Sequence, residues 1–324
     1  MDIKVGTFNL NNLFSRFNFS GAIEDIQSGG ATGSMTFRYE FTDPENVRIR
    51  TFRGKLVRAK DPDDTQTIAQ RILTMNVDVL AVQEVENIGI LKMFNQEHLG
   101  NLFAYQILIE GNDPRFIDVG ILSKLPVGAI SSFQTTVHEE DPTRRIFGRD
   151  LLEIEILNAT RTQKLFTLFN THLKSHFGDD ENSGQGKIKN DTRRRRQAEK
   201  VREIIGSRTR PDSKYILTGD INDPPDAPPL QSMLTIEGNQ LFDGLVNPTE
   251  TRPSKEESSG HDPQSPAWTH RFKESGQPPA HELFDHIWLS PALAPAFQAS
   301  FIDRRTKHGG DGSDHDPAWV ELDI

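Results

Sequence analysis

The chain has no cysteine among its 324 residues, which excludes disulfide bonds and thiolate metal sites. It also lacks any run of about 18 apolar residues, the length that a transmembrane helix requires. Positive charge is in deficit, because 37 lysines and arginines stand against 47 aspartates and glutamates and leave a formal net charge of −10. Proteins that bind nucleic acid through overall charge are usually basic, so such a substrate would need a local basic patch here, or metal ions to hold it.

The first predicted strand begins close to the start of the given sequence. Met1 lies two residues before a strand expected over Ile3–Asn9, whereas a secretory signal needs a basic segment followed by an apolar stretch. We therefore expect a cytoplasmic protein for the chain as it stands, or a secreted one whose signal has been removed. Without an internal repeat or a long linker, 1–324 is expected to form one domain, with a β-hairpin insertion at about 15–60.

Hydrophobic patterning predicts an alternation of strands and helices. Strands are expected over 3–9, 77–82, 104–109, 117–122, 129–135, 151–157, 165–170, 215–218, 284–289 and 319–322. Helices are expected over 65–75, 87–99 and 191–207. Asp63 or Asp64 is expected to cap the first helix, and the segments 178–186 and 247–264 are interpreted as polar surface loops.

Six short motifs of Asn, Asp, Glu and His lie at the ends of predicted strands, where a sheet can gather distant residues into one site. They are Thr7–Asn11, Val82–Glu84, Asn170–Leu173, Gly219–Asp223, Phe284–His286 and Ser313–Asp316. Their carboxylates at 84, 220, 285 and 314 would repel one another without a cation. Hard oxygen ligands with His and Asn beside them indicate Mg²⁺ or Mn²⁺, and phosphate chemistry.

The first two motifs each admit two interpretations. Glu84 follows an apolar strand, a poor place for a surface salt bridge, so a metal-binding role is favoured; the alternative is a charge at the N-terminus of the helix over 87–99. Asn9 and Asn11 are two residues apart and would share one face of an extended segment. One could then ligate metal while the other orients Glu84 or the phosphate, unless the pair simply forms an Asn-rich turn.

The later motifs supply candidates for acid–base chemistry. Asp220 can bind metal or polarise the attacking water, and Asn222 can donate to a phosphoryl oxygen, although the segment also fits a plain tight turn. His172 ends a strand, where a histidine is more often structural or exposed. Asp285 could hold the ring of His315 in one tautomer, as carboxylate–histidine pairs do.

Asp314 and His315 would face opposite ways in an extended segment, which suits one metal ligand and one acid or base that share a loop. The plainer interpretation of Asp285 and His286 is a pair of exposed residues at the start of a strand. Each motif alone is modest evidence, whereas their fixed order along the chain is much stronger.

The ordered set resembles the endonuclease/exonuclease/phosphatase superfamily, the divalent-metal phosphoesterases related to pancreatic DNase I and the abasic-site endonucleases. The resemblance covers nearly the whole chain. The segments Gln83–Asn87, Gly148–Leu152 and Asn170–Ser175 and the Arg-rich segment Arg193–Ala198 are most similar to a bacterial branch that includes secreted nucleases. The fold this implies is an α/β four-layer sandwich, with two packed mixed β-sheets flanked by helices.

The resemblance also implies a ligand set. Asn11, Glu84 and Asp314 would surround the first metal, and Asp220 and Asn222 would lie on the other side of the phosphate, where they could also ligate. Some members of the superfamily have Asp at the position of Asn11, so ligation by Glu84 is the firmer expectation. The expected ion is Mg²⁺ or Mn²⁺, with Ca²⁺ as an alternative.

By the same resemblance, His315, aligned by Asp285, would be the general base or a phosphate contact. His172 would contact the phosphate or assist the leaving oxygen. Further candidates for phosphate or substrate binding are Asn9, Arg149, Lys174 and Arg196.

The similarity to the bacterial branch that includes secreted nucleases is the main indication of the substrate class. A nuclease that cleaves DNA or RNA is the first hypothesis, with the four consecutive arginines 193–196 as backbone contacts; only one or two of them can face a site, because they fan around a helix. They could instead form a solvated face paired with Glu199 and Glu203. The second hypothesis is a phosphatase, or a phospholipase-type phosphodiesterase acting on an inositol or choline lipid headgroup. A catalytically inactive binding module is the third.

Overall fold

The computed structural model describes residues 1–14, 60–176, 184–246, 248–251, 267–272, 280–304 and 312–324. The hairpin expected within the insertion at about 15–60 lies outside the described residues, and so does most of the loop expected over 247–264. The expectation of a single domain therefore stays a prediction.

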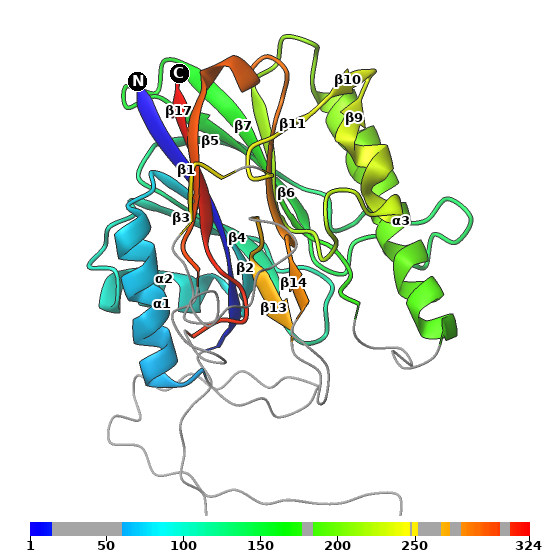
Figure 1. Cartoon of the computed structure of the whole chain (residues 1–324), viewed down its shortest axis with the longest axis horizontal. Helices are drawn as coiled ribbons and strands as arrows, with labels where there is room; N and C mark the ends of the chain where they lie inside the picture. Colours follow the sequence, from blue (N-terminus) through cyan, green and yellow to red (C-terminus); the bar gives the residue numbers. More distant parts are fainter. Residues whose placement is uncertain (15–59, 177–183, 247, 252–266, 273–279, 305–311) are drawn as a thin grey trace, which may run out of the picture.

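Two β-sheets pack face to face (Figure 1). The seven-stranded sheet has the order β12 (Glu250–Thr251), β16 (Phe297–Ile302), β17 (Ala318–Asp323), β1 (Asp2–Leu13), β2 (Val79–Val85), β4 (Asp118–Ser123) and β3 (Tyr105–Leu108). The six-stranded sheet has the order β11 (Phe242–Asp243), β15 (Asp285–Leu289), β8 (Tyr215–Asp220), β7 (Lys164–His172), β6 (Leu151–Leu157) and β5 (Val127–Ser132). Both are mixed, since β1 pairs with β2 and β7 with β8 in parallel while most other neighbours are antiparallel.

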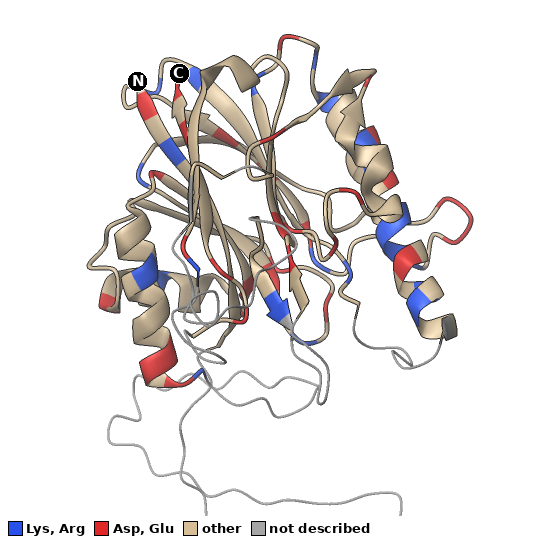
Figure 2. Cartoon of the chain, viewed as in Figure 1, with Lys and Arg blue, Asp and Glu red and all other residues tan. Residues whose placement is uncertain are grey.

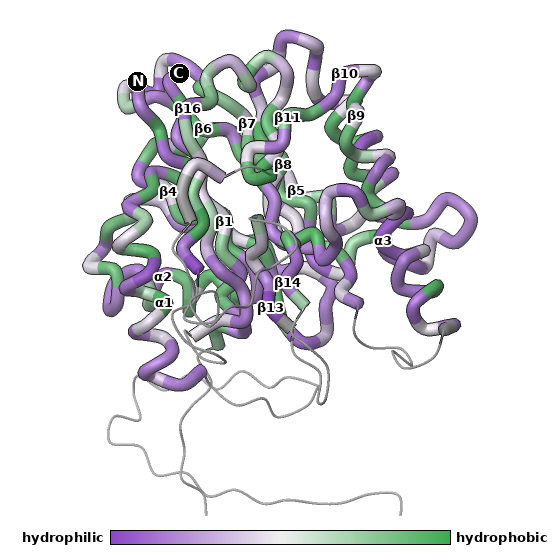
Figure 3. Tube along the Cα trace, viewed as in Figure 1, coloured by the Kyte–Doolittle hydropathy of each residue, from purple (hydrophilic) through white to green (hydrophobic). Residues whose placement is uncertain are grey.

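Helices cover the two outer faces (Figure 1). α1 (Pro62–Met75) and α2 (Ile88–Glu97) bury their apolar sides against β1 and β2, and α3 (Gly184–Arg208) and the 3₁₀ helix η2 (Pro228–Leu234) pack on the other sheet. Three apolar clusters therefore separate four layers, and Figure 3 shows many hydrophobic residues along the strands. The predicted four-layer α/β-sandwich is confirmed. Among the described residues, no helix is long and apolar enough to cross a membrane.

Two helix starts differ from the prediction. α1 begins at Pro62 and is capped by Asp61, whose side chain accepts from the amide of Asp63, so the expected cap at Asp63 or Asp64 is wrong. A proline is favoured in the first helical turn, which explains the earlier start. α3 begins at Gly184 instead of Asp191.

Several short elements were not predicted. β9 (Thr235–Ile236) and β10 (Asn239–Gln240) pair with each other, as do β13 (His270–Phe272) and β14 (Ala280–Glu282). β16 was missed because its centre, Gln298–Ser300, is polar and small, and its burial alternates irregularly. The remaining predicted strands and helix α2 are present with shifts of a few residues at their ends.

Candidate active site

The six-stranded sheet brings three predicted site residues to one place by register alone. β7 and β8 run parallel with His172 opposite Asp220, and β15 pairs with β8 so that Asp285 is also opposite Asp220. Gly219 permits this approach, because it has a φ of 135° and a Cβ there would lie 1.9 Å from the carbonyl oxygen of Thr171. The glycine of the fourth motif is thus required by the packing of the two strands.

Asp220 is the centre of the cluster. Its Oδ2 accepts from Asn9 Nδ2 at 2.9 Å and lies 3.2 Å from His172 Nε2 and 3.7 Å from His315 Nε2. Its Oδ1 accepts from the backbone amide of Asn222 at 3.0 Å. Burial, with the nearby Asp285 carboxylate, raises the pKa of Asp220 to about 7, although His315 and Asn9 act in the other direction. A carboxylate with such a pKa can exchange protons near neutral pH.

The two histidines beside Asp220 have opposite electrostatic surroundings. Burial alone would lower the pKa of His315, but Asp285 and Asp220 outweigh it and raise that pKa well above its usual value. Its Nδ1 lies 2.7 Å from Asp285 Oδ2, the contact expected for an aligning carboxylate. Burial and the guanidinium of Arg149 instead hold the pKa of His172 well below its usual value. These surroundings therefore favour the protonated form of His315 and the neutral form of His172.

The seven-stranded sheet contributes the second half of the site. Asn11 and Glu84 both have positive φ, at 45° and 61°. The amide of Asn11 donates to Asn9 Oδ1 at 2.9 Å, and the amide of Asn12 donates to Glu84 Oε2 at 3.1 Å. The backbone at Asn11 is therefore left-handed and not extended, so the strand alternation from which a shared face of Asn9 and Asn11 was predicted does not apply there.

Glu84 lies on β2, ahead of α2. That helix begins at Ile88, and its cap is Asn87, whose side chain accepts from Ile90. The alternative role for Glu84, a charge in the first helical turn, is therefore wrong.

Ser313 ties the last motif to this half of the site. Its hydroxyl donates to the carbonyl of Asn9 at 2.7 Å and accepts from the amide of His315 at 3.0 Å. The loop thus places an exposed Asp314 and a buried His315 beside the end of β1.

Among the described residues, two groups of acidic and histidine side chains could hold a divalent cation, and Glu84 belongs to neither group. Burial and the neighbouring carboxylate of Asp314 raise the pKa of Glu84, so two acids oppose each other where positive charge would relieve them. Carboxylate oxygens and the side-chain amide oxygen of Asn11, which here accepts from Asn12 Nδ2 at 3.0 Å, are the kind of ligand that Mg²⁺ and Mn²⁺ prefer. Ligand atoms of Asp220, Asp285 and His315 lie within 4.8 Å of one another, and those of His270, Asp314 and His315 do so as well.

Arg149, a predicted phosphate contact, lies between the Leu173 carbonyl and Asp113. It is buried, its Nη1 donates to the carbonyl of Leu173 at 3.2 Å, and its Nε lies 3.3 Å from Asp113 Oδ2. Burial lowers its pKa, while the charges of Glu84 and Asp220 act to raise it. The guanidinium is thus within the electrostatic reach of both halves of the site.

Other predicted contacts are placed differently. The Lys174 ammonium donates to the carbonyl of Ser175 at 3.0 Å, and its amide donates to Gln197 at 2.9 Å. Arg196 is exposed on α3 and lies 3.4 Å from Glu140. Among the described residues, Arg196 forms no hydrogen bond or ion pair with Asp220, so the structure does not gather it with the central cluster.

Two residues near the site were missed from the sequence. Lys60 donates to the carbonyl of Asn11 at 2.6 Å, and burial lowers its pKa against the opposing charges of Asp64, Asp314 and Glu84. Lys60 lies at the end of the insertion at about 15–60 and belongs to none of the six motifs, so the sequence did not indicate a role for it. His270 lies with its ring centroid 4.9 Å from that of His315 and 4.8 Å from that of Phe284. Its strand has only three residues, too few for a hydrophobic signal.

A buried acid behind Arg149 gives a prediction about stability. Asp118 accepts from the amide of Gly111 at 2.7 Å, and burial, with Glu110, Asp113 and Asp150 nearby, raises its pKa to about 7. Because the folded-state pKa exceeds the unfolded value of 3.8, the free energy of unfolding falls as pH rises from about 4 to 7. We expect Asp118→Asn to reduce this fall and to be more stable than the wild type at pH 8, with a ceiling of about 4 kcal/mol. Urea unfolding across pH measures it, and a curve parallel to the wild type would contradict it.

The sequence matches the family model of the Endonuclease/Exonuclease/phosphatase family over residues 6–315. The chain belongs to this family, whose members are hydrolases of phosphoester bonds. No curated protein matches the sequence significantly.

Solved structures with the same fold come from several different organisms. A mannosyl-6-phosphatase from Bacteroides thetaiotaomicron is 16% identical with a TM-score of 0.56, over 99% of this chain and 100% of that chain. An AP endonuclease from Archaeoglobus fulgidus is 14% identical with a TM-score of 0.56, over 99% and 100%. D. rerio TDP2 complexed with a single-strand DNA product is 13% identical with a TM-score of 0.57, over 100% and 99%. At these identities, the likeness concerns the fold.

Proposed function

We propose that this protein is a Mg²⁺- or Mn²⁺-dependent phosphodiesterase that hydrolyses nucleic-acid phosphodiester bonds by in-line attack of water. The observation that best supports this proposal is that Asn9, His172 and His315 all approach one oxygen of Asp220. The carboxylates of Glu84 and Asp314, which repel each other, contribute to the same site. A cluster of titratable groups with perturbed pKa values at the ends of strands is typical of a hydrolytic site.

Asp220 is best suited to accept the proton of the attacking water. Its pKa of about 7 leaves a large fraction of the carboxylate ionised at neutral pH, while its basicity remains high. His315, whose pKa is raised, would remain protonated and donate to a phosphoryl oxygen, with Asp285 holding its ring. This favours the phosphate-contact role of His315 over the role of base.

The other polar groups would bind and orient the phosphate. The neutral imidazole of His172 can donate to the phosphate or to the leaving oxygen, and Arg149 can balance its charge. Asn222 lies beside Arg149, because its Nδ2 donates at 3.2 Å to the same Leu173 carbonyl that Arg149 contacts. A metal held by Glu84, Asp314 and Asn11 would supply electrostatic stabilisation of charge developing on the phosphoryl oxygens.

Nucleic acid is the preferred substrate for two reasons. The segments that resemble secreted bacterial nucleases include Arg149, at the site, and Arg193–Ala198, on α3. Two proteins of similar fold, the AP endonuclease and TDP2 with a single-strand DNA product, support the same choice. The phosphatase hypothesis keeps support from the mannosyl-6-phosphatase.

The direct test is digestion of supercoiled plasmid, single-stranded DNA and RNA with Mg²⁺, Mn²⁺ or EDTA, with His315→Ala in parallel. We expect metal-dependent cleavage, lowered by about 10² to 10⁴-fold in the variant because one charged donor to the phosphate is lost. Near-full activity of His315→Ala would contradict the assignment. If the folded protein cleaves no nucleic acid but hydrolyses sugar phosphates, the phosphatase is the correct function; binding to liposomes would instead favour the lipid-headgroup enzyme.

A further inference from the structure

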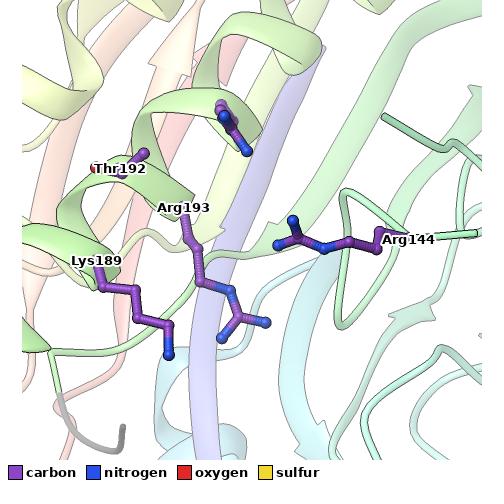
Figure 4. A pocket seen from close by; sticks show the side chains of 5 residues that line it. Arg144, Lys189, Thr192 and Arg193 are labelled. Atoms are coloured by element: carbon purple, nitrogen blue, oxygen red, sulfur yellow. The ribbon is translucent and has the colours of Figure 1, made fainter. Parts of the chain in front are cut away.

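A basic pocket lies beside α3, outside the Asp220 cluster. It has a volume of about 430 Å³ and is lined by Arg144, Lys189, Thr192, Arg193 and Arg196. In Figure 4, Arg193 and Lys189 extend from the helix and Arg144 extends toward them from the loop opposite. Four cations around one pocket stand out in a chain whose formal net charge is −10.

The helix presents this face because its other face is anchored. Positions 189, 192, 193 and 196 follow the i, i+3, i+4, i+7 spacing that lines one side of an α-helix. Arg194 points the other way and is fully buried, with its Nε 2.6 Å from Asp223 Oδ2 and its Nη1 donating to the carbonyl of Lys174 at 3.0 Å. Arg195 is exposed but does not line the pocket, so the four consecutive arginines have three different surroundings.

The opposite wall belongs to the same scaffold. The loop that carries Arg144 is closed by a bridge between Val137 and Arg145, and Gln197 of α3 donates to the carbonyl of Ile146 at 3.1 Å. The same Gln197 side chain accepts from the amide of Lys174, two residues beyond His172. Both walls are therefore fixed relative to the strand that supplies a candidate phosphate ligand.

The pocket and the candidate active site lie toward the same end of the sandwich. In Figure 1, the first half of α3 and the β13–β14 hairpin, which carries His270, both lie in the lower part of the molecule. Figure 2 shows basic residues on this half of α3, as well as on the other half. A strand that occupies the site could extend to the pocket without turning around the molecule.

We propose that this pocket binds a backbone phosphate of the nucleic-acid strand whose scissile phosphate lies at Asp220; the inference rests on the proposed nuclease function. Guanidinium groups match phosphate oxygens in charge and in hydrogen-bond geometry, and Lys189 adds a point charge. Glu140, 3.4 Å from Arg196, is highly exposed and can move aside when a phosphate competes for the guanidinium. The pocket supplies the local positive charge that an acidic nuclease needs.

An anionic membrane is the less favoured occupant. On the described part of α3, the exposed large hydrophobic residue is Ile188, with 66% of its surface accessible. A helix that lies on a membrane buries a continuous apolar face, and one side chain beside four cations does not form one. The geometry thus suits a discrete phosphate group better than a bilayer.

The test measures binding of a labelled oligonucleotide by fluorescence anisotropy in EDTA. We compare Arg193→Glu and Arg144→Glu with Arg195→Glu, a matched control with the same charge change on the same exposed helix. Each pocket variant is expected to bind roughly tenfold more weakly and to lower the slope of log K against log salt by about 1. The control is expected to stay close to the wild type.

The possible results separate the two proposals. Two results would overturn the pocket as a phosphate site: an equal loss of oligonucleotide affinity in Arg195→Glu and Arg193→Glu, or unchanged affinity in both pocket variants. Neither result would contradict the proposed nuclease function. A wild-type protein that binds the oligonucleotide through the pocket but cleaves no nucleic acid with metal would overturn the nuclease function alone. Loss of binding to anionic vesicles in the pocket variants, with oligonucleotide binding unchanged, would assign the pocket to a membrane.

Discussion

Asp220→Asn is expected to lower kcat by about 10³-fold, within the range typical for loss of a catalytic base. The substitution keeps the shape of the side chain but removes the oxygen charge on which Asn9, His172 and His315 converge. An amide cannot take the proton of the attacking water. KM is expected to change less than kcat, because Arg149 and His172 remain to bind the phosphate.

The same variant should be more stable than the wild type in the absence of metal at pH 8. Asp220 is then largely ionised and buried, and its raised pKa of about 7 measures the unfavourable burial of that charge. Lower activity with higher stability separates a catalytic role from a structural one, since loss of a structural contact would lower both.

Steady-state kinetics on a nucleic-acid substrate and urea unfolding at pH 8 check the two effects. Asp226→Asn is the matched control, because Asp226 is exposed six residues further along the same segment and should leave both quantities near the wild type. If Asp220→Asn retains more than about a hundredth of the activity, Asp220 is not the base, because a loss of less than about 10²-fold is too small for that role.

Much of the six-stranded half of the site was predictable. Strand ends at His172, Asp220 and Asp285 are visible in the hydrophobic pattern, and parallel or antiparallel pairing of neighbouring strands brings such ends together. The contact between Asp285 and His315 was also expected from the sequence. In the structure, His315 Nδ1 lies 2.7 Å from Asp285 Oδ2.

The other half was harder to predict, because it depends on backbone conformations that composition does not specify. Asn11 and Glu84 have positive φ, which is unusual for a glutamate and turns both residues out of the strand alternation. His270 reaches the site through a three-residue strand, too short to leave a periodic signal.

The arginines of α3 show a third limit. The 100° advance per residue indicates that 193–196 must diverge, but it does not say which one turns inward. The choice of Arg194 follows from its partners Asp191 and Asp223, whose positions depend on the β8 turn and on where the helix starts. A helix predicted to begin at Asp191 left out Lys189, which lines the basic pocket.

Glu84→Gln is expected to abolish most metal-dependent activity, by about 10² to 10³-fold, and to weaken metal binding. Glu84 is the one carboxylate that β2 contributes to the site. The negative charge of Asp314 disfavours ionisation of Glu84, and a bound cation would relieve this repulsion. A neutral amide keeps the side-chain length but removes the charge that would attract Mg²⁺ or Mn²⁺.

Thermal unfolding with and without Mn²⁺ tests this independently of activity. A ligand that binds the folded protein at a hundredfold excess over its Kd stabilises it by about 2.7 kcal/mol, so the wild type should unfold at a higher temperature with Mn²⁺. Glu84→Gln should lose most of that increase. Without metal it should be at least as stable as the wild type, because one of two opposed acids is gone.

The exposed Glu97→Gln on α2 is the control, and it should retain the increase with Mn²⁺. A Glu84→Gln protein that is destabilised without metal but still stabilised by Mn²⁺ would place the ion elsewhere. The second cluster, where ligand atoms of Asp220, Asp285 and His315 lie within 4.8 Å, would then be the alternative, and Asp285→Asn would have to remove the effect. The two variants thus distinguish which sheet of the sandwich holds the metal.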